Sequence, residues 1–476
     1  MKTYEELRDF IRRHKVEMVD LKFSDLFGRW QHVTLPVSAF GPDVLNGGVA
    51  FDGSSVAGFR RKEGGDLALI PDTGTCLLDP FWEVPTLSLL CQAANAATLE
   101  PFSRDPRGIA IRATEHMRAL GIATESIWQA ELEFYIFNEV SYGNQVNSSF
   151  YRIESEEAAW NTAESCTHQL GHNIPHQGGY HAIPPLDRLY HLRTRMVKLI
   201  EQAGIPVRYH HHEVGGPGQC EIEFTRLPFL TCADGAMWAK YIIKNAAIAS
   251  KLSATFMPKP LYAEAGSGLH FHQNLVRGRR NLFHDAKGPE GLSETALHYI
   301  GGLLTHGRAL LALTNPSTNS YKRLVAGFEA PTLLFYGVAN RSAAIRIPKY
   351  ARDPDEKRIE FRPPDGTCNI YLAMAAMLMA GLDGIRRKID PRKLGMGPIN
   401  TDIRRLRPED LRNIVAVPAS LREALQALVD DHAFLTAEGV FPEDLISVWV
   451  EQKLAREAEE VQNRPHPYEM TLYYDF

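Results

Sequence analysis

Four short segments of the chain alternate polar and apolar side chains with a period of two. Residues 131–134, 221–224, 269–272 and 359–362 each place charged or histidine side chains two positions apart, separated by a Leu, Ile or Phe. Successive side chains of a β-strand point to opposite faces, so the polar members of each segment share one face. The shorter segment His212-Glu213 is of the same chemical kind. We therefore expect a sheet with one buried apolar face and one face that gathers carboxylates and imidazoles.

Apolar residues at helical spacing predict long helices between further strands. Short strands at 16–23 and 31–35 flank a turn at 24–29, and a Pro- and Asp-rich stretch at 101–107 opens a helix. We predict an α+β protein of two domains, residues 1–104 and residues 105–476. The expected helices cover residues 3–14, 109–120, 187–203, 233–254, 292–313, 370–388, 420–430 and 443–461.

The segment 141–180 is rich in Ser, Asn, Gly and His and is expected to form a long surface excursion. The longest apolar run, residues 372–382, is too short to span a bilayer and is typical of a buried helix. The first residues contain acidic side chains and no apolar stretch, which argues against a signal peptide.

Composition narrows the classes of function. The 476 residues are 44% hydrophobic, which is enough for a large core. A net charge of −5 gives no electrostatic case for a nucleic-acid partner. The 6 cysteines contain no C-x-x-C pair, which fits a reducing compartment. We expect a cytoplasmic protein that binds neither nucleic acid nor membrane.

The polar strand faces carry carboxylates that would repel one another strongly if the strands adjoin. Two carboxylates ~5 Å apart at an effective dielectric of ~20 repel by roughly 3 kcal/mol. Either their pKa values rise or cations neutralise them. Oxygen ligands with an occasional imidazole suit Mg²⁺ or Mn²⁺. The carboxylates concerned are those of Glu131, Glu133, Glu213, Glu221 and Glu360.

The alternative explanation for each Glu-x-Glu segment is the solvated face of an edge strand, which is common in antiparallel sheets. It explains one such segment better than it explains four in one chain. Glu223 is the weakest candidate, because Glu221 lies closer to the His-rich turn. The alternative to a ligand role for Glu223 is a solvent-exposed position.

Further distinctive segments follow one another along the chain. In this order they resemble the glutamine synthetase family, specifically its bacterial class I type. The resemblance runs from about Glu17 to Pro467. The segments are Phe-Asp-Gly-Ser-Ser at 51–55, His-His-His-Glu-Val at 210–214 with a Gly-rich turn to 221, Gly-Ser-Gly at 266–268, Asn-Pro-Ser-Thr-Asn-Ser-Tyr-Lys-Arg at 315–323, Gly-Phe-Glu-Ala-Pro at 327–331, Asn-Arg-Ser-Ala-Ala-Ile-Arg-Ile-Pro at 340–348 and Arg-Ile-Glu-Phe-Arg-Pro-Pro-Asp at 358–365.

The resemblance implies a small N-terminal β-grasp-like domain and a large catalytic domain with an antiparallel curved sheet flanked by helices. It implies ATP-dependent ligation of ammonia to the γ-carboxylate of glutamate through γ-glutamyl phosphate, with two or more Mg²⁺ or Mn²⁺ ions. It also implies a homo-oligomer of two stacked hexameric rings, in which each active site lies between neighbouring subunits.

Residue-by-residue matching to the family assigns two metal sites that agree with the strand pattern. The first metal should orient the acceptor carboxylate, and the second should bridge phosphate oxygens as the γ-phosphoryl group moves. One metal would be held by Glu133, Glu213 and Glu221, and the other by Glu131, His270 and Glu360.

The same matching assigns the ATP phosphates to three arginines and a further nucleotide contact to His272. Arg341, Arg346 and Arg358 would clamp phosphate oxygens through planar guanidinium groups, and Arg341 is also a catalytic candidate. The alternative for any one of these arginines is an ordinary pair with a nearby Asp or Glu.

The resemblance assigns glutamate and the acyl phosphate to Arg323, Arg362 and the backbone of Gly266. Glu329 would close over the intermediate and exclude the water that hydrolyses it. An in-strand pair between Arg362 and Glu360 is the structural alternative, and both roles are compatible with a shared strand face.

Asp52, Tyr180 and Glu213 match the ammonium pocket of the family. An anionic pocket binds NH₄⁺, and Asp52 would then take a proton so that the nitrogen lone pair can attack. In the family this Asp comes from the adjacent subunit, so we expect an isolated subunit to be inactive. The alternative role for Asp52 is ordinary turn chemistry before Gly53.

The chain departs from the family pattern at several positions. Ala265 replaces an Asn that contacts the amino-acid end of the substrate, which leaves the acid substrate open. Asn274 stands where a Ser is usual, and Phe59 where Trp is frequent. The segment 397–408 contains no tyrosine where many class I enzymes carry a regulatory one, so we expect no adenylylation there.

Three other functions compete with glutamine synthesis. A γ-glutamyl amide ligase would use an organic amine, and the retained Asp52, Tyr180 and Glu213 favour ammonia over it. A non-catalytic ring-forming relative is disfavoured by the intact metal ligands and phosphate arginines. A two-metal nucleotidyl transferase is remote, because the chain contains no P-loop pattern.

Overall fold

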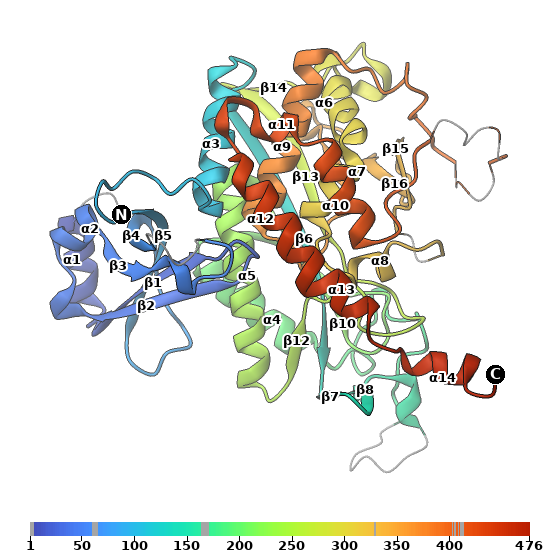
Figure 1. The fold of residues 1–476 in the computed structure, drawn as a ribbon, viewed down its shortest axis with the longest axis horizontal. Coiled ribbons are helices and arrows are strands. Elements are labelled where there is room, and N and C mark those ends of the chain that lie inside the picture. The colour runs from blue at the N-terminus through green and yellow to red at the C-terminus, as the bar shows by residue number, and fades with distance from the viewer. Residues whose placement is uncertain are drawn as a thin grey trace.

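The N-terminal part of the chain forms a five-stranded sheet (Figure 1) with the strand order β2-β1-β5-β4-β3. The computed structural model describes residues 4–59, 65–162, 171–327, 330–401, 403, 406–407, 409 and 414–476. Strands β1 and β5 are parallel, and the other pairs are antiparallel. The elements are α1 (Tyr4–Arg13), β1 (Met18–Ser24), β2 (Trp30–Pro36), α2 (Pro42–Gly47), β3 (Val49–Asp52), β4 (Asp66–Leu78) and β5 (Thr86–Asn95).

This small sheet has a hydrophobic core of its own. Leu7 of α1 packs with Leu21 and Phe23 of β1 in one hydrophobic cluster. The last buried residue of this cluster in the sequence is Phe102. Helix α3 (Pro106–Ala119) then begins after Asp105, whose side chain accepts a hydrogen bond from the Gly108 N–H at 2.9 Å. The domain boundary that we predict at residue 104 remains a proposal. It lies between the end of β5 and the start of α3.

The larger sheet has β6 at its centre, flanked by antiparallel β10 and β13. Its main order is β15-β16-β17-β13-β6-β10-β9, with short strands β11 and β12 on β6 and β14 on β13. The pairs are antiparallel apart from β15 and β16, which are parallel. Its strands are β6 (Glu125–Phe137), β9 (Val207–His212), β10 (Gln219–Phe224), β11 (Leu227–Pro228), β12 (Ser253–Thr255), β13 (Leu269–Arg277), β14 (Arg280–Asn281), β15 (Leu333–Val338), β16 (Ala343–Ile347) and β17 (Ile359–Phe361).

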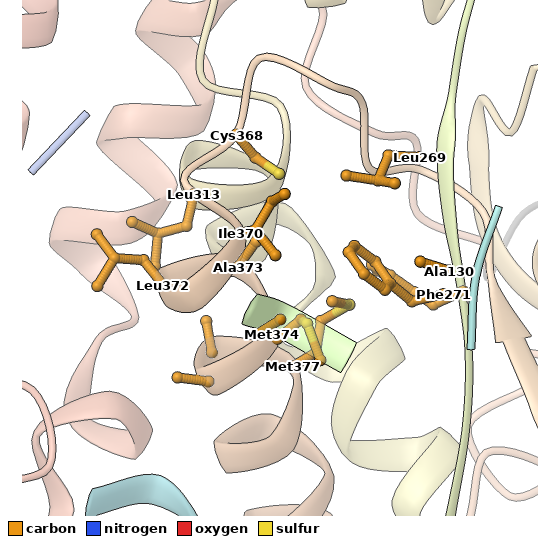
Figure 2. Packing of buried hydrophobic residues seen from close by; sticks show 14 of the residues in the cluster. Ala130, Leu269, Phe271, Leu313, Cys368, Ile370, Leu372, Ala373, Met374 and Met377 are labelled. Carbon is orange, nitrogen blue, oxygen red and sulfur yellow. The ribbon is translucent and has the colours of Figure 1, made fainter. Parts of the chain in front are cut away.

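Helices cover the apolar face of the large sheet, and 15 of the 18 residues of α9 are buried. Figure 2 shows Phe271 and Ala130 of the sheet facing Met374 and Met377 of α9, with which they share one cluster. None of the described helices combines the length and apolarity that a bilayer crossing requires. The helices are α4 (Tyr190–Gln202), α5 (Phe229–Ala249), α6 (Glu294–Thr305), α7 (Gly307–Thr314), α8 (Ser320–Arg323), α9 (Ile370–Arg387), α10 (Leu421–Asp430), α11 (Ala433–Thr436), α12 (Glu443–Lys453), α13 (Glu459–Gln462) and α14 (Pro467–Tyr473).

The fold belongs to the predicted α+β class, but two of the predicted helices are each interrupted in the structure. The helix predicted at 292–313 breaks at His306, whose ring lies 2.8 Å from Asp431 and 3.0 Å from Asp383, so tertiary contacts fix a turn there. The helix predicted at 443–461 contains a π-helical turn between α12 and α13. The predicted excursion 141–180 overlaps a hairpin of β7 (Glu139–Gln145) and β8 (Ser148–Glu154).

Glycines allow α6 and α9 to touch along their backbones. A Cβ atom at Gly302 would lie 2.0 Å from the carbonyl oxygen of Ala380, and one at Gly384 would lie 2.2 Å from that of His298. Because backbone atoms cannot rotate away as a side chain does, neither position has room for a larger residue.

We therefore predict that Gly302→Ala lowers the free energy of unfolding by about 3 kcal/mol, since α6 has to move away from α9. The matched control is Gly47→Ala in α2, where an added Cβ meets nothing within 4 Å. The control should change stability by less than about 1 kcal/mol. Equal denaturation midpoints for the two variants would contradict this account of the contact.

Candidate active site

A cavity of about 900 Å³ opens over the polar face of the large sheet. All six predicted metal ligands line it, namely Glu131, Glu133, Glu213, Glu221, His270 and Glu360. The other predicted residues in its wall are Tyr180, Gly266, Arg323, Arg341, Arg346 and Arg362. Segments from distant parts of the sequence therefore meet at one place.

The strand register explains why these side chains meet. Glu221 of β10 pairs with Glu133 of β6, and His270 of β13 pairs with Glu131 of β6. Glu360 of β17 extends the row on the far side of β13. The residues between them, such as Leu132 and Phe271, are at most 1% exposed and face the helices. The period-two pattern thus produces a polar row across several strands.

The first group of possible metal ligands lies at β9 and β10. His211, Glu213 and Glu221 offer ligand atoms that all lie within 4.8 Å of one another. Burial and repulsion by Glu133 raise the pKa of Glu213 well above its usual value. Burial and repulsion by Glu131 and Glu133 do the same to the pKa of Glu221.

Glu133 connects the two groups. One of its carboxylate oxygens accepts a hydrogen bond from the Gly268 N–H at 2.6 Å, and the other lies 3.7 Å from Nδ1 of His270. The backbone therefore holds this carboxylate between β10 and β13.

The second group contains Glu131, His270 and Glu360, whose ligand atoms also lie within 4.8 Å of one another. Nδ1 of His270 is 3.0 Å from Glu131. Burial alone would raise the pKa of Glu131, but His272 and His270 hold it well below its usual value. Burial is likewise outweighed at Glu360, where Arg362 leads the charges that lower the pKa.

These donors fit hard divalent cations. The two groups supply carboxylate oxygens and an occasional imidazole, which is the ligand chemistry of Mg²⁺ and Mn²⁺. The raised pKa values of Glu213 and Glu221 reflect negative charges that lack sufficient compensation. A divalent cation would supply that compensation.

Arginines also line the cavity, and several of them lie next to the second group. Nη1 of Arg346 and Nη1 of Arg362 donate to the two oxygens of Glu360 at 2.5 and 2.6 Å, so the in-strand pair of Arg362 is present. Arg323 is buried, and its Nη1 donates to the Pro363 carbonyl at 2.7 Å. The Arg341 guanidinium lies 5.8 Å from the ring centre of Tyr180.

Two predicted nucleotide contacts lie behind the cavity wall. His272 is fully buried, and its Nε2 is 2.5 Å from Glu131. Arg358 is 4% exposed, and its Nε lies 3.4 Å from Nδ1 of His272. Neither residue is part of the described cavity lining.

Of the two remaining predicted residues, one is not part of this cavity within the chain. Asp52 lies at the end of β3 and is absent from the described lining; it accepts hydrogen bonds from the Ser54 N–H at 2.8 Å and the Ser55 hydroxyl at 2.6 Å. These turn contacts lower the pKa of the exposed Asp52 carboxyl. The second residue, Glu329, lies outside the described residues.

The structure corrects two expectations about the site. On β9 it is His211, not His212, that joins Glu213 on the polar face; His212 is buried with its Nε2 3.2 Å from Glu157. Glu223 is also fully buried rather than exposed, and it accepts a hydrogen bond from Arg208 at 2.8 Å. The spacing of two between His211 and Glu213 is the sequence signal that identifies His211.

Sequence models of two domains match almost the whole chain. "Glutamine synthetase, beta-Grasp domain" matches residues 15–96, and "Glutamine synthetase, catalytic domain" matches residues 103–473. The chain belongs to the glutamine synthetase family. This confirms the resemblance inferred from the sequence, the predicted fold class and the assignment to the ligases.

Relatives along the full length agree with this placement. The chain is 45% identical to the glutamine synthetase of Mycolicibacterium smegmatis over 478 residues, which covers 100% of the chain and 99% of the relative. It is 46% identical to that of Frankia alni over 472 residues, or 99% of each.

Solved structures are similar over the whole chain as well. The cryo-EM structure of Plasmodium falciparum glutamine synthetase has a TM-score of 0.90 and 29% identity, with 100% of this chain and 99% of that chain covered. A structure described as a GmaS/ADP complex has a TM-score of 0.81 and 26% identity, with both chains fully covered at 100%.

Glu133→Gln should weaken cation binding, because it removes the charge of the carboxylate that lies between the two groups. We expect Mn²⁺ at about 100 times its Kd to stabilise the wild-type protein by about 2.7 kcal/mol. The variant should lose most of this gain, and the thermal unfolding midpoint with and without Mn²⁺ measures it. Glu83→Gln changes an exposed carboxylate away from the cavity and serves as the control. An unchanged Mn²⁺ response in Glu133→Gln would refute its role as a ligand.

Proposed function

We propose that this enzyme makes glutamine from glutamate, ammonia and ATP, with release of ADP and phosphate. The observation that carries the proposal is the convergence of two carboxylate groups with the arginines on one cavity. Binding of a triphosphate requires cationic groups, and phosphoryl transfer in proteins commonly uses paired divalent ions. Membership of the glutamine synthetase family supports the choice of reaction.

The proposed cations are two or more Mg²⁺ or Mn²⁺ ions. When bound, they would neutralise phosphate charge and polarise the reacting oxygens. We assign one to Glu133, Glu213 and Glu221, with His211 beside it, and the other to Glu131, His270 and Glu360. The fit of the donor atoms described above supports both assignments.

The first chemical step forms γ-glutamyl phosphate. A γ-carboxylate oxygen of glutamate attacks the γ-phosphorus of ATP, the bond to the β–γ bridging oxygen breaks, and ADP leaves. We assign the phosphates to Arg341, Arg346, Arg358 and His272, since guanidinium groups stabilise the charge on the moving phosphoryl group. We assign glutamate to Arg323, Arg362 and the backbone of Gly266.

The second step replaces phosphate by nitrogen. Ammonium binds to Tyr180, Glu213 and an Asp52 that comes from the neighbouring subunit, and Asp52 takes one proton. The nitrogen then attacks the acyl carbon, the carbon–oxygen bond to phosphate breaks, and phosphate leaves with the second proton that the nitrogen releases to become the amide. We assign closure of the site over the intermediate to Glu329.

The proposed assembly is a homo-oligomer of two stacked hexameric rings in the cytoplasm. Exposed aromatic residues support association, because a large apolar surface is unfavourable in water. Tyr142 and Phe150 on the hairpin β7–β8 are 78 and 52% exposed, and Tyr474 and Phe476 after α14 are 80 and 104% exposed. Helix α14 extends from the body of the chain (Figure 1) and has no core of its own.

The second candidate function is a γ-glutamyl amide ligase that uses an organic amine. Its support is the structural similarity to a protein described as GmaS at 26% identity. Tyr180 and Glu213 in the cavity wall favour a small cation such as ammonium, because Glu213 supplies a carboxylate. Ammonia is therefore the preferred nitrogen donor.

An assay of amine choice separates these candidates. Phosphate release with ATP, Mg²⁺ and glutamate should be at least about tenfold faster with ammonium than with methylamine, ethanolamine or putrescine, because the Glu213 carboxylate suits a small cation. Reactions without glutamate give the background. Faster release with any of the amines would reverse the preference.

Mixing of inactive subunits tests whether the site is shared. Asp52→Asn and Glu133→Gln should each be inactive alone, because one lacks the proton acceptor and the other a metal ligand. Equal amounts that are dissociated and reassembled at random should regain about one quarter of wild-type activity, since half of the sites have an intact Glu133 and half of those an intact neighbouring Asp52. Reassembled single variants are the controls. No recovery in the mixture would contradict a shared site.

A further inference from the structure

Tyr350 has three arginine side chains around its ring. The guanidinium carbons of Arg208 and Arg358 each lie 5.3 Å from the ring centre, and that of Arg346 lies 5.7 Å from it. Tyr350 follows β16 by a few residues, is 43% exposed and lines the cavity. One aromatic side chain thus connects cations from β9, β16 and the segment before β17.

Three like charges around one ring repel one another, so something has to hold them in place. Glu360 accepts from Arg346 at 2.5 Å, and Glu223 accepts from Arg208 at 2.8 Å. The described polar contacts of Arg358 are to the ring nitrogen of His272, at 3.4 Å, and to the Glu356 carbonyl, at 3.0 Å, and neither partner is a carboxylate. The negative face of the Tyr350 ring therefore supplies much of the attraction available to Arg358.

Two of these arginines are the ones assigned to the ATP phosphates. A phosphate site is effective when its cations already stand in the binding geometry, because no side chains then have to be ordered on binding. Cation–π contact to a shared ring restrains the guanidinium planes without using their N–H donors. The N–H donors that do not already bind Glu360, His272 or the Glu356 carbonyl remain available for phosphate oxygens.

We propose that Tyr350 is a positioning residue that preorganises Arg346 and Arg358 for the triphosphate through its ring, while its hydroxyl group contacts Arg208. This inference rests on the proposed function, because it takes ATP as the ligand of these arginines. Tyr350 is not among the site residues predicted from the sequence. Its role would be to hold the phosphate-binding arginines in place before ATP binds.

The test compares Tyr350→Phe, which keeps the ring, with Tyr350→Leu, which removes it. Tyr350→Leu should raise the Kd for ATP with Mg²⁺, and the KM for ATP, by about tenfold, since it removes the ring contacts to Arg346 and Arg358. Tyr350→Phe should stay within about twofold of the wild type. The KM for glutamate and kcat should change little in both variants.

The matched control is Tyr190→Leu at the start of α4. Tyr190 is also 43% exposed but is absent from the described cavity lining, so the same substitution is made at equal exposure. Its Kd for ATP should equal that of the wild type. Thermal unfolding midpoints of all variants show whether a change is a general loss of structure.

Three outcomes would overturn the inference. They are an unchanged Kd for ATP in Tyr350→Leu, an equal loss in Tyr350→Phe, and a parallel loss of kcat, both KM values and thermal stability. Failure of the proposed function is distinguishable from these: a wild-type protein that binds ATP but makes no glutamine would refute that function, while the Kd comparison still decides the role of Tyr350. A wild-type protein that does not bind ATP would refute both.

Discussion

Repulsion among buried carboxylates is the constraint on which the rest of this structure depends. Glu131, Glu133 and Glu221 are fixed on neighbouring strands by backbone hydrogen bonds, so they cannot relax apart without breaking the sheet. At a separation of ~5 Å each such pair costs roughly 3 kcal/mol at an effective dielectric of ~20. The hydrophobic cluster beneath them, which joins the sheet to α9, provides the stability that holds the charges together.

The negative charges of the carboxylates are offset to different extents in the two parts of the cavity. This difference indicates which part suits which substrate group. On the side of Glu360 and Glu131, guanidinium groups and imidazoles lower the pKa values of the carboxyl groups. On the side of Glu213 and Glu221 such cations are fewer, and the pKa values rise. One half of the cavity is therefore suited to anionic phosphate beside its arginines, and the other half to cations, including a metal ion and ammonium. This polarity matches a reaction that joins a phosphorylated acid to an ammonium-derived nitrogen.

The sequence predicted the parts that depend on local periodicity. Segments such as 131–134 and 221–224 alternate strictly, and a one-residue shift would expose Leu132 or Ile222, so their burial fixes which carboxylates share a face. Features set by distant contacts were not predictable. The break at His306 depends on Asp383 and Asp431, and the burial of Glu223 depends on Arg208 and Gln129. Chemical kind alone favours the adjacent pair His212-Glu213, whereas the period of two favours His211 with Glu213, which is the arrangement in the structure.

The position of Asp52 links the proposed chemistry to the proposed assembly. Within its own chain Asp52 is exposed, engaged in a turn and separate from the described cavity lining. Its low pKa keeps it ionised, which suits a group that attracts ammonium but makes it a weak base in isolation. If a neighbouring subunit's cavity, with the raised pKa values of Glu213 and Glu221, receives this carboxylate, repulsion there raises its affinity for a proton. Association would then create the base as well as complete the pocket, so that deprotonation of ammonium depends on the presence of both subunits.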